Sequence, residues 1–268
     1  MKVLKFGGSS VGNSERIERV IDIIRIGSKD EQNVLVVFSA YQGITNQLIE
    51  TGNLAAGGNP EYKRLFEEIS KRHLQTAKHL IKGESRKASL AQIKQWLNNL
   101  EEILYGVFLV KELTLKTLDY IMSFGERLSA YTISQSMNAS GLKNMFLDTR
   151  EVIVTDNSFG NARVDIEKTN PRIQDFCKSN QTLIIATGFI ASTVKGETTT
   201  LGRGGSDYTA SLFGAALEAS EIEIWTDVDG VLTADPRKVP QAFPVKQMTY
   251  LEAMELSHFG AKVIHPPT

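Results

Sequence analysis

The chain has 268 residues, of which 41% are hydrophobic and 23% charged, as is typical of a globular protein. Its 30 Lys and Arg residues against 31 Asp and Glu give a net charge of −1, so nothing predicts a general attraction to nucleic acid or to an anionic membrane. No apolar run approaches the roughly 20 residues that span a bilayer. The single cysteine, Cys177, cannot form an internal disulfide, so we expect a cytoplasmic protein in which this thiol is structural.

The first elements indicate a βαβ unit. A strand at 3–6 ends at two glycines, and Asn13 or Ser14 could cap the helix that follows. That helix has apolar residues at helical spacing and ends near Gly27. Five consecutive apolar residues at 34–38 then predict a strand buried on both faces, as in a parallel sheet.

Residues 60–141 are predicted to be almost entirely helical. Three amphipathic segments follow one another, and the clearest break lies at 82–86. The block is rich in charge and poor in glycine. We interpret it as a helical insertion or lid beside a sheet.

The α/β pattern returns after this block. The expected elements are strands at 143–147 and 152–154, a helix at 171–179, a strand at 182–186, a hairpin within 189–199, a helix at 206–219 capped by Ser206, and a strand at 222–225. Such alternation predicts an α/β fold, a three-layer αβα sandwich with a mainly parallel central sheet and a helical insertion. Ligands of such sheets bind beyond the carboxyl ends of the strands.

The first candidate loop follows the first strand. Gly7 and Gly8 would let the backbone approach a ligand, and the next helix begins with free N–H groups that favour an anion. Lys5, at the strand end, could reach a transferred phosphate. The lysine precedes the glycines, so this is not a Walker loop, and an ordinary Gly-Gly turn remains an alternative.

A second glycine loop is more specific. Gly202, Gly204 and Gly205 flank Arg203 just before a helix, where their N–H groups could bind phosphate and the guanidinium a carboxylate. Asp207 falls in the first helical turn, where a carboxylate is stabilised in any case, so a helix-capping role stays open.

Acidic and basic residues near the end of the sequence suggest a nucleotide site. Asp227, Asp229 and Asp235 could bind a ribose or hydrated Mg²⁺, and Lys262 could face phosphates. A calcium loop is rejected because Pro236 stands where that loop needs glutamate. No histidine pair has a third ligand nearby, so no protein-held metal is expected.

Glu126 follows a glycine that is out of place inside a helix. Gly125 would cost about 1 kcal/mol relative to alanine, which close packing or a close ligand would explain. An exposed pair of Glu126 with Arg127 is the alternative.

Taken together, these segments resemble the aspartokinase family within the amino-acid kinase fold. The stretches that carry the resemblance, in family order, are 5–11, 43–46, 123–128, 188–189, 201–207, 225–237 and 256–266. The run 225–237 with 252–257 is most similar to the kinase portion of bifunctional aspartokinase/homoserine dehydrogenases. Members of the family normally continue into regulatory domains. We therefore expect 1–268 to be the kinase catalytic domain alone. The resemblance implies a homo-oligomer for the full-length protein, but neither this oligomerisation nor the family's feedback control is carried over to this chain.

The resemblance implies a role for each matching residue. Lys5 and Asp207 would be catalytic, with Lys5 on the transferring phosphoryl group. Thr45, Glu126, Arg203 and Ser206 would bind aspartate, with Glu126 on its amino group and Arg203 on its α-carboxylate. The residues implied around ATP are Gly7, Gly8, Ser9, Gly204, Gly205, Thr226, Asp227, Asp235, Arg237 and Lys262.

The implied reaction converts ATP and L-aspartate to ADP and 4-phospho-L-aspartate, the first step of lysine, threonine and methionine biosynthesis. Aspartate's side chain is ionised at pH 7, so no general base is required, and Mg²⁺ would be held mainly by ATP. The alternatives are a kinase of the same fold acting on glutamate, acetylglutamate or a nucleoside monophosphate, and a silent amino-acid-sensing module. A Rossmann dehydrogenase would need G-x-G-x-x-G after the first strand, which is absent.

Overall fold

A computed structural model describes residues 1–28, 34–227, 230–234 and 238–258. Its main sheet has five strands, all parallel, in the order β3-β5-β2-β1-β8. The strands are β1 (Lys2–Phe6), β2 (Val34–Phe38), β3 (Asn144–Leu147), β5 (Leu183–Thr187) and β8 (Glu221–Trp225). Every residue of β2 is buried, as the unbroken apolar run predicted.

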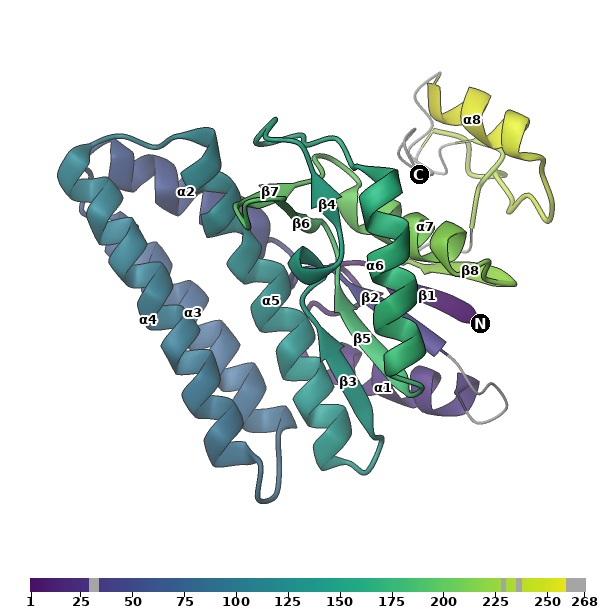
Figure 1. Cartoon of the computed structure of the whole chain (residues 1–268), viewed down its shortest axis with the longest axis horizontal. Coiled ribbons are helices and arrows are strands. Elements are labelled where there is room, and N and C mark those ends of the chain that lie inside the picture. Colours follow the sequence, from purple (N-terminus) through teal and green to yellow (C-terminus); the bar gives the residue numbers. More distant parts are fainter. Residues whose placement is uncertain (29–33, 228–229, 235–237, 259–268) are drawn as a thin grey trace.

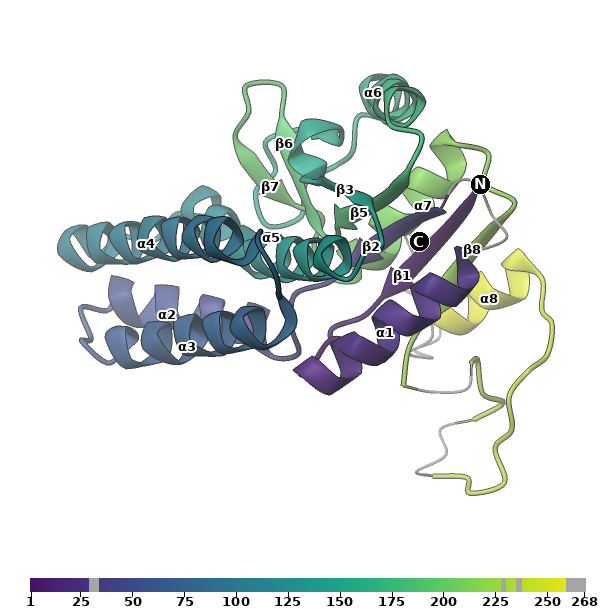
Figure 2. The same cartoon turned by 90° about the horizontal axis from the view of Figure 1, so that it is seen from below.

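Helices cover both faces of this sheet, so the predicted three-layer fold is confirmed (Figure 2). On one face lie α1 (Ser14–Gly27) and α5 (Leu115–Ala139), and on the other α6 (Ile166–Ser179) and α7 (Gly205–Ala216). Strand residues alternate between the two cores: Phe6 and Phe38 face the α1 side, whereas Val3 and Val37 face the α7 side.

The helical block forms a bundle that extends from the α5 side of the sheet to one end of the molecule and shares a hydrophobic core with the sheet (Figure 1). It consists of α2 (Ile44–Ala56), α3 (Tyr62–Leu80), α4 (Arg86–Val110) and α5, all packed on one another. The predicted block began at 60 and omitted α2. Glycines within and after that segment resemble turn signals, but Gly52 is helical and its missing side chain leaves room for Leu113. The predicted break is confirmed, with Gly83 at φ +72°.

A small three-stranded sheet lies beside α5. It contains β4 (Val154–Thr155), β6 (Ile190–Thr193) and β7 (Thr198–Thr200), and β6 and β7 form the predicted hairpin. The expected strand at 152–154 is largely wrong, because a 3₁₀ turn, η1 (Thr149–Glu151), comes first and only Val154 pairs. Buried apolar runs of this length do not distinguish a strand from other buried backbone.

Two helix starts also differ from expectation. α6 begins at Ile166 and contains Pro171, because Asp165 caps it by accepting the N–H of Lys168. α7 begins one residue early and is capped by Gly204 in the left-handed conformation, so Ser206 is not the cap. The last described helix is α8 (Tyr250–His258). None of the described helices is long and apolar enough to cross a membrane.

Candidate active site

A pocket of about 360 Å³ lies at the carboxyl ends of β1, β2 and β5, beside the start of α7. Residues 39–43 after β2, called the Ser39 loop, and residues 202–207 form much of it. Residues 7–13 after β1, called here the glycine loop, contribute Gly8. The pocket brings together nine residues expected from the sequence: Lys5, Gly8, Thr45, Glu126, Arg203, Gly204, Gly205, Ser206 and Asp207. Segments about 200 residues apart in the chain therefore meet as predicted.

Lys5 and Asp207 form an ion pair within the pocket. Lys5 Nζ lies 2.5 Å from Asp207 Oδ1, and the two side chains are 11% and 21% exposed. Lys5 is held by β1, whereas Asp207 belongs to the first turn of α7. The ammonium is thus placed beside a helix N-terminus, where an anionic ligand would meet both the lysine charge and the helix dipole.

Glu126 is buried in α5 and is only 3% exposed. Its Oε1 accepts the N–H of Ala40 at 3.2 Å, and its Oε2 has no hydrogen-bond partner among the described residues. Burial raises the pKa of Glu126 to about 8. The alternative of an exposed pair with Arg127 is wrong, since both are buried. A buried carboxyl with a free oxygen beside a pocket suits a cationic ligand group.

Gly125 explains how α5 approaches so closely. A side-chain Cβ at this position would lie 2.9 Å from Ala40 Cβ, so only glycine lets the helix contact the Ser39 loop. The unusual glycine therefore serves close packing, which in turn brings Glu126 to the pocket.

The loop around Arg203 needs its glycines for the backbone. Gly202 and Gly204 both have φ +72°, a region that other residues rarely adopt. Gly205 packs against Phe189, where a Cβ would be 2.8 Å from the ring. Arg203 is itself exposed at the pocket mouth, so its guanidinium can reach a ligand from solvent.

The residues expected around the nucleotide are only partly described. The sheet register pairs Phe6 with Trp225, so Gly7 and Thr226 follow neighbouring strand ends. Thr226 and Asp227 are exposed and hydrogen-bonded to each other at 3.1 Å. Ser9 accepts a hydrogen bond from Arg16 through its carbonyl at 2.8 Å. Gly7, Ser9, Thr226 and Asp227 do not line the pocket. Asp235, Arg237 and Lys262 lie outside the described residues.

No group of three His, Cys, Asp or Glu side chains in the described ranges is arranged to hold a metal ion. Cys177 is buried, and burial raises its pKa to about 11, so the thiol is inert, as expected.

Sequence reasoning missed several residues of the pocket. Ser39, Ala40, Tyr41 and Gln42 also line it. Their one signal was position, because they directly follow the most hydrophobic strand. Phe189 lines it too, although it was noted only as part of a matching stretch.

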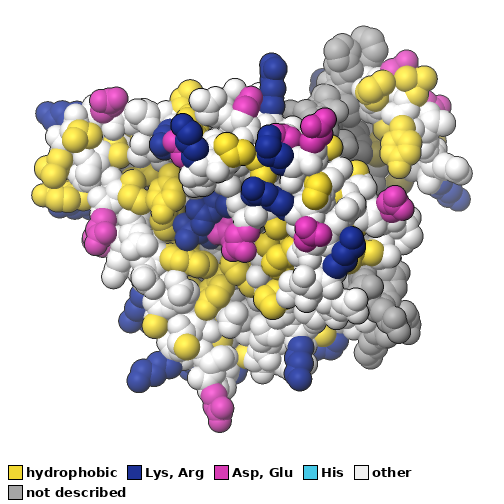
Figure 3. All heavy atoms as spheres, viewed as in Figure 1, with side chains coloured by type: hydrophobic (Ala, Val, Ile, Leu, Met, Phe, Trp, Pro, Cys, Tyr) yellow, Lys and Arg dark blue, Asp and Glu magenta, His cyan; other side chains and the backbone are white. Residues whose placement is uncertain are grey.

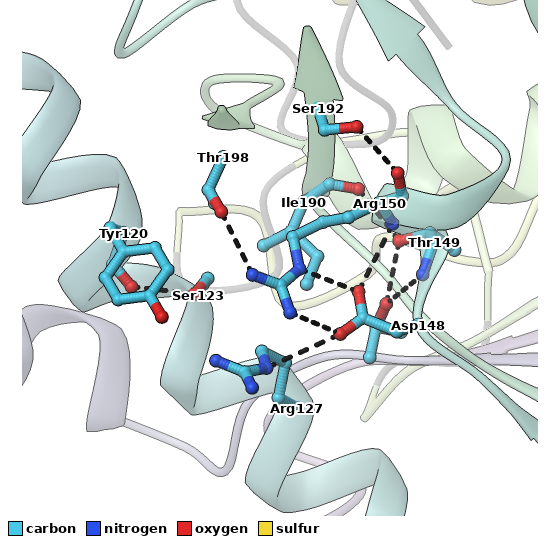
Figure 4. A network of polar contacts seen from close by, with 10 residues as sticks. Tyr120, Ser123, Arg127, Asp148, Thr149, Arg150, Ile190, Ser192 and Thr198 are labelled. Atoms are coloured by element: carbon cyan, nitrogen blue, oxygen red, sulfur yellow. Dashed lines mark hydrogen bonds and ion pairs between the residues drawn. The ribbon is translucent and has the colours of Figure 1, made fainter. Parts of the chain in front are cut away.

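A cluster of charged side chains forms around Arg127, the residue that follows Glu126 in α5 (Figure 4). Arg150 donates to both oxygens of Asp148, at 2.9 and 2.7 Å, and Arg127 Nε lies 3.4 Å from Asp148 Oδ2. The Arg127 guanidinium also lies over the rings of Trp96 and Phe124, at 4.7 and 4.8 Å from their centroids. On the face seen in Figure 3, basic and acidic side chains are interspersed.

Comparison with known proteins identifies the family. The model of the amino acid kinase family matches residues 1–268, and the chain belongs to that family. It is 38% identical, over 99% of its length, to bifunctional aspartokinase/homoserine dehydrogenase 1, chloroplastic, of Zea mays, covering 29% of that protein. It is 41% identical, over 98% of its length, to aspartokinase 3, chloroplastic, of Arabidopsis thaliana, covering 47%.

A solved structure supports the same grouping. E. coli aspartokinase III in complex with aspartate and ADP (R-state) matches the whole chain with a TM-score of 0.90 and 36% identity, and 58% of that chain is covered. The predicted amino-acid kinase fold is confirmed. The chain spans between 29% and 58% of the lengths of these relatives.

Proposed function

We propose that the chain is the catalytic domain of an aspartate kinase, transferring the γ-phosphoryl group of ATP to the side-chain carboxylate of L-aspartate. The observation that carries this proposal is the free, buried Oε2 of Glu126 in a pocket that also contains Arg203. An α-amino acid presents an ammonium and a carboxylate together, and these two side chains are their natural partners. The names of the relatives and the aspartate and ADP of the E. coli complex support the same substrates.

In this proposal aspartate binds through its α-substituents. Glu126 receives the ammonium and Arg203 the α-carboxylate, while Thr45 and Ser206 donate hydroxyl hydrogen bonds. With these groups held, the side-chain carboxylate faces Lys5 and the start of α7. A ligand ammonium favours the ionised form of Glu126, so aspartate binding releases the proton that burial retains.

The chemistry requires neutralisation of charge more than proton transfer. The substrate carboxylate is already ionised at pH 7. One of its oxygens attacks the γ-phosphorus, the bond to the β–γ bridging oxygen breaks, and ADP leaves with that electron pair. Lys5 and the N–H groups at Gly204 and Gly205 would stabilise the charge on the transferring phosphoryl oxygens. Mg²⁺ carried by ATP would neutralise the same charge when bound.

The nucleotide would extend from the pocket toward Thr226 and Asp227, past the glycine loop. Asp235, Arg237 and Lys262 stay predictions for its base, ribose and phosphates. The helical block at 60–141 stays a predicted lid that would keep water from the acyl phosphate product. A cytoplasmic location and a homo-oligomer of the full-length protein also stay predictions.

A substrate panel tests the function. Purified protein is incubated with ATP, Mg²⁺, hydroxylamine and either aspartate, glutamate or N-acetylglutamate, and hydroxamate and ADP are measured together. We expect hydroxamate and ADP in equal amounts with aspartate only. A preference for another amino acid would identify a sister kinase, and no ADP with any of them would favour a sensing module.

Arg203→Ala refines this test. Loss of the guanidinium removes a charged contact worth about 1.5–3 kcal/mol, so the KM for aspartate should rise about 10- to 100-fold with a smaller change in the KM for ATP. Arg172→Ala, at an exposed position of α6, is the matched control and should behave as wild type. An unchanged KM for aspartate in Arg203→Ala would refute the assignment.

A further inference from the structure

The glycine loop and the Ser39 loop meet at the pocket but belong to different strands. Ser39 N–H donates to the carbonyl of Phe6 at 3.2 Å, where the two strands end. Beyond that point the loops pack without spare room: a Cβ on Gly8 would lie 3.0 Å from the Ala40 carbonyl, and one on Gly12 would lie 3.0 Å from Gln42 Oε1. Their relative position therefore affects Lys5 on one side and Glu126 on the other.

One arginine of the helical block connects these loops. Arg72, on α3, donates from Nη1 to the carbonyl of Gln42 at 2.8 Å and from Nη2 to the carbonyl of Gly12 at 2.9 Å. A guanidinium is planar and its two terminal nitrogens are a fixed distance apart, so the pair of bonds sets the spacing of the two carbonyls. A lysine could bind either carbonyl but could not hold both in this geometry.

The next residue of α3 fixes the helix itself to the Ser39 loop. His73 is fully buried and stacks on Tyr41, with ring centroids 4.7 Å apart and an interplanar angle of 22°. The Arg72 guanidinium lies 5.9 Å from the centroid of the same tyrosine ring. Burial, with a smaller contribution from Arg72, lowers the pKa of His73 to about 3, so His73 is neutral and Arg72 carries the charge of this contact.

We propose that Arg72 is a positioning residue, which holds the glycine loop and the Ser39 loop at the spacing that catalysis requires. The inference rests on the proposed function, because the glycine loop would carry the phosphates of the donor and the Ser39 loop supports Glu126 through Ala40 N–H. Arg72 touches no reacting atom. It acts by setting the distance between donor and acceptor, to which transfer rates are highly sensitive.

The role predicts a loss of turnover greater than the loss of binding. Arg72→Met keeps most of the side-chain volume but removes the charge and both donors. A misplacement of about 1 Å lowers a reaction rate about 100-fold, so we expect kcat to fall about 100-fold while the KM values for ATP and aspartate change only about threefold. Arg72→Lys should recover part of the lost kcat, because it keeps one contact.

The matched control is Arg64→Met, at an exposed position on the same helix. Arg64 forms surface ion pairs with Glu61 and Glu68, and surface pairs contribute little. Hydrogen–deuterium exchange supplies a readout that is independent of activity. Arg72→Met should raise exchange in peptides covering 7–13 and 39–43, and Arg64→Met should not. If Arg72→Met fails to fold, Arg72→Lys takes its place in the same comparison.

The outcomes separate this inference from the proposed function. If wild type phosphorylates no amino acid, the proposed function is wrong, and the exchange comparison still decides the role of Arg72. A folded Arg72→Met protein with kcat within about twofold of wild type, or with unchanged exchange in both loops, would overturn the inference. A lower Tm with normal kcat would show that Arg72 is merely structural.

Discussion

Two consecutive residues of α5, Glu126 and Arg127, are both buried and ionisable, yet their surroundings differ. Glu126 has one hydrogen bond, from Ala40, and one oxygen without a partner among the described residues. Arg127 has two aromatic rings against its guanidinium and the carboxylate of Asp148 nearby. Glu126 faces a pocket, whereas Arg127 faces other protein groups.

The difference separates a binding group from a structural one. Burial raises the pKa of Glu126 to about 8, and nothing in the described chain offsets that cost with an opposite charge. Burial and the nearby Arg150 lower the pKa of Arg127 to about 10, and Asp148 opposes that shift. Arg127 Nε and Nη1 form no regular hydrogen bond in the described region, so ring faces and Asp148 stabilise it instead. A buried ionisable group that faces a pocket and has no opposite charge beside it indicates a ligand that would supply that charge.

The Lys5–Asp207 ion pair is a test of this distinction. Lys5, like Arg127, has an opposite charge beside it, yet it faces the pocket. In our proposal Lys5 stabilises the charge on the transferring phosphoryl oxygens. Lys5→Met should therefore lower kcat about 10³-fold and leave the far-UV circular dichroism spectrum unchanged. Turnover near the wild-type value would place Lys5 with the structural charges.

The Arg127 cluster gives the next largest effect, on stability rather than activity. Asp148→Asn leaves the buried guanidinium of Arg127 and the half-buried one of Arg150 without their carboxylate, so the free energy of unfolding should fall by about 3–5 kcal/mol. Arg127→Met should lower the free energy of unfolding by less than Asp148→Asn does, because Arg150 still binds both oxygens of Asp148. Urea unfolding measures both values, and the reverse order would show that Arg127, not Arg150, is the main partner of Asp148.

Glu126→Gln tests the binding role of Glu126 and should have a smaller effect than the two changes above. Gln keeps the shape but cannot pair with an ammonium as a carboxylate does, so the KM for aspartate should rise about 10- to 100-fold. In wild type this KM should fall as the pH rises toward 8, because ionised Glu126 is the binding form. Glu126→Gln should lose that dependence, whereas Glu84→Gln, in an exposed turn, should keep it.

The same residue predicts a pH dependence of stability. The pKa of Glu126 is 4.5 unfolded and about 8 folded, so between these values the folded state binds the proton and the unfolded state does not. The contribution of Glu126 to the free energy of unfolding therefore falls as the pH rises from 4.5 to about 8. Glu126→Gln should remove that part of the slope in urea unfolding measured across this range, and an unchanged slope would contradict the raised pKa.

Local signals were enough to predict most of the fold. The apolar run of β2, the glycines after β1 and before α7, and the amphipathic spacing of α3 to α5 each indicated the element that the structure contains. The helix α2 was missed because Gly52 resembles a break when its packing partner Leu113 is unknown. Propensity is a weak guide where tertiary packing decides.

The loops of the site could be predicted from the sequence, but the packing contacts that hold them in place could not. Lys5, Glu126 and Asp207 stood out by position or by motif. The buried state of Glu126 did not, because charged residues such as Glu and Arg are usually exposed at the surface of a helix. Arg72 had no local signal at all, and Tyr41 had only its position after β2, since their roles depend on distances between α3 and the loops it contacts.

The position of β1 has a consequence for the nascent chain. β1 lies between β2 and β8, and Lys5 is paired in register with Val37 and Ile224. During translation the helices α2 to α5 can assemble early, because their contacts are local in sequence. β1 cannot form its hydrogen bonds to β8 until the ribosome has released the strand that ends at Trp225. β1 thus obtains both of its neighbours only after the other strands of the main sheet have been made, and the pocket at its carboxyl end cannot form before then.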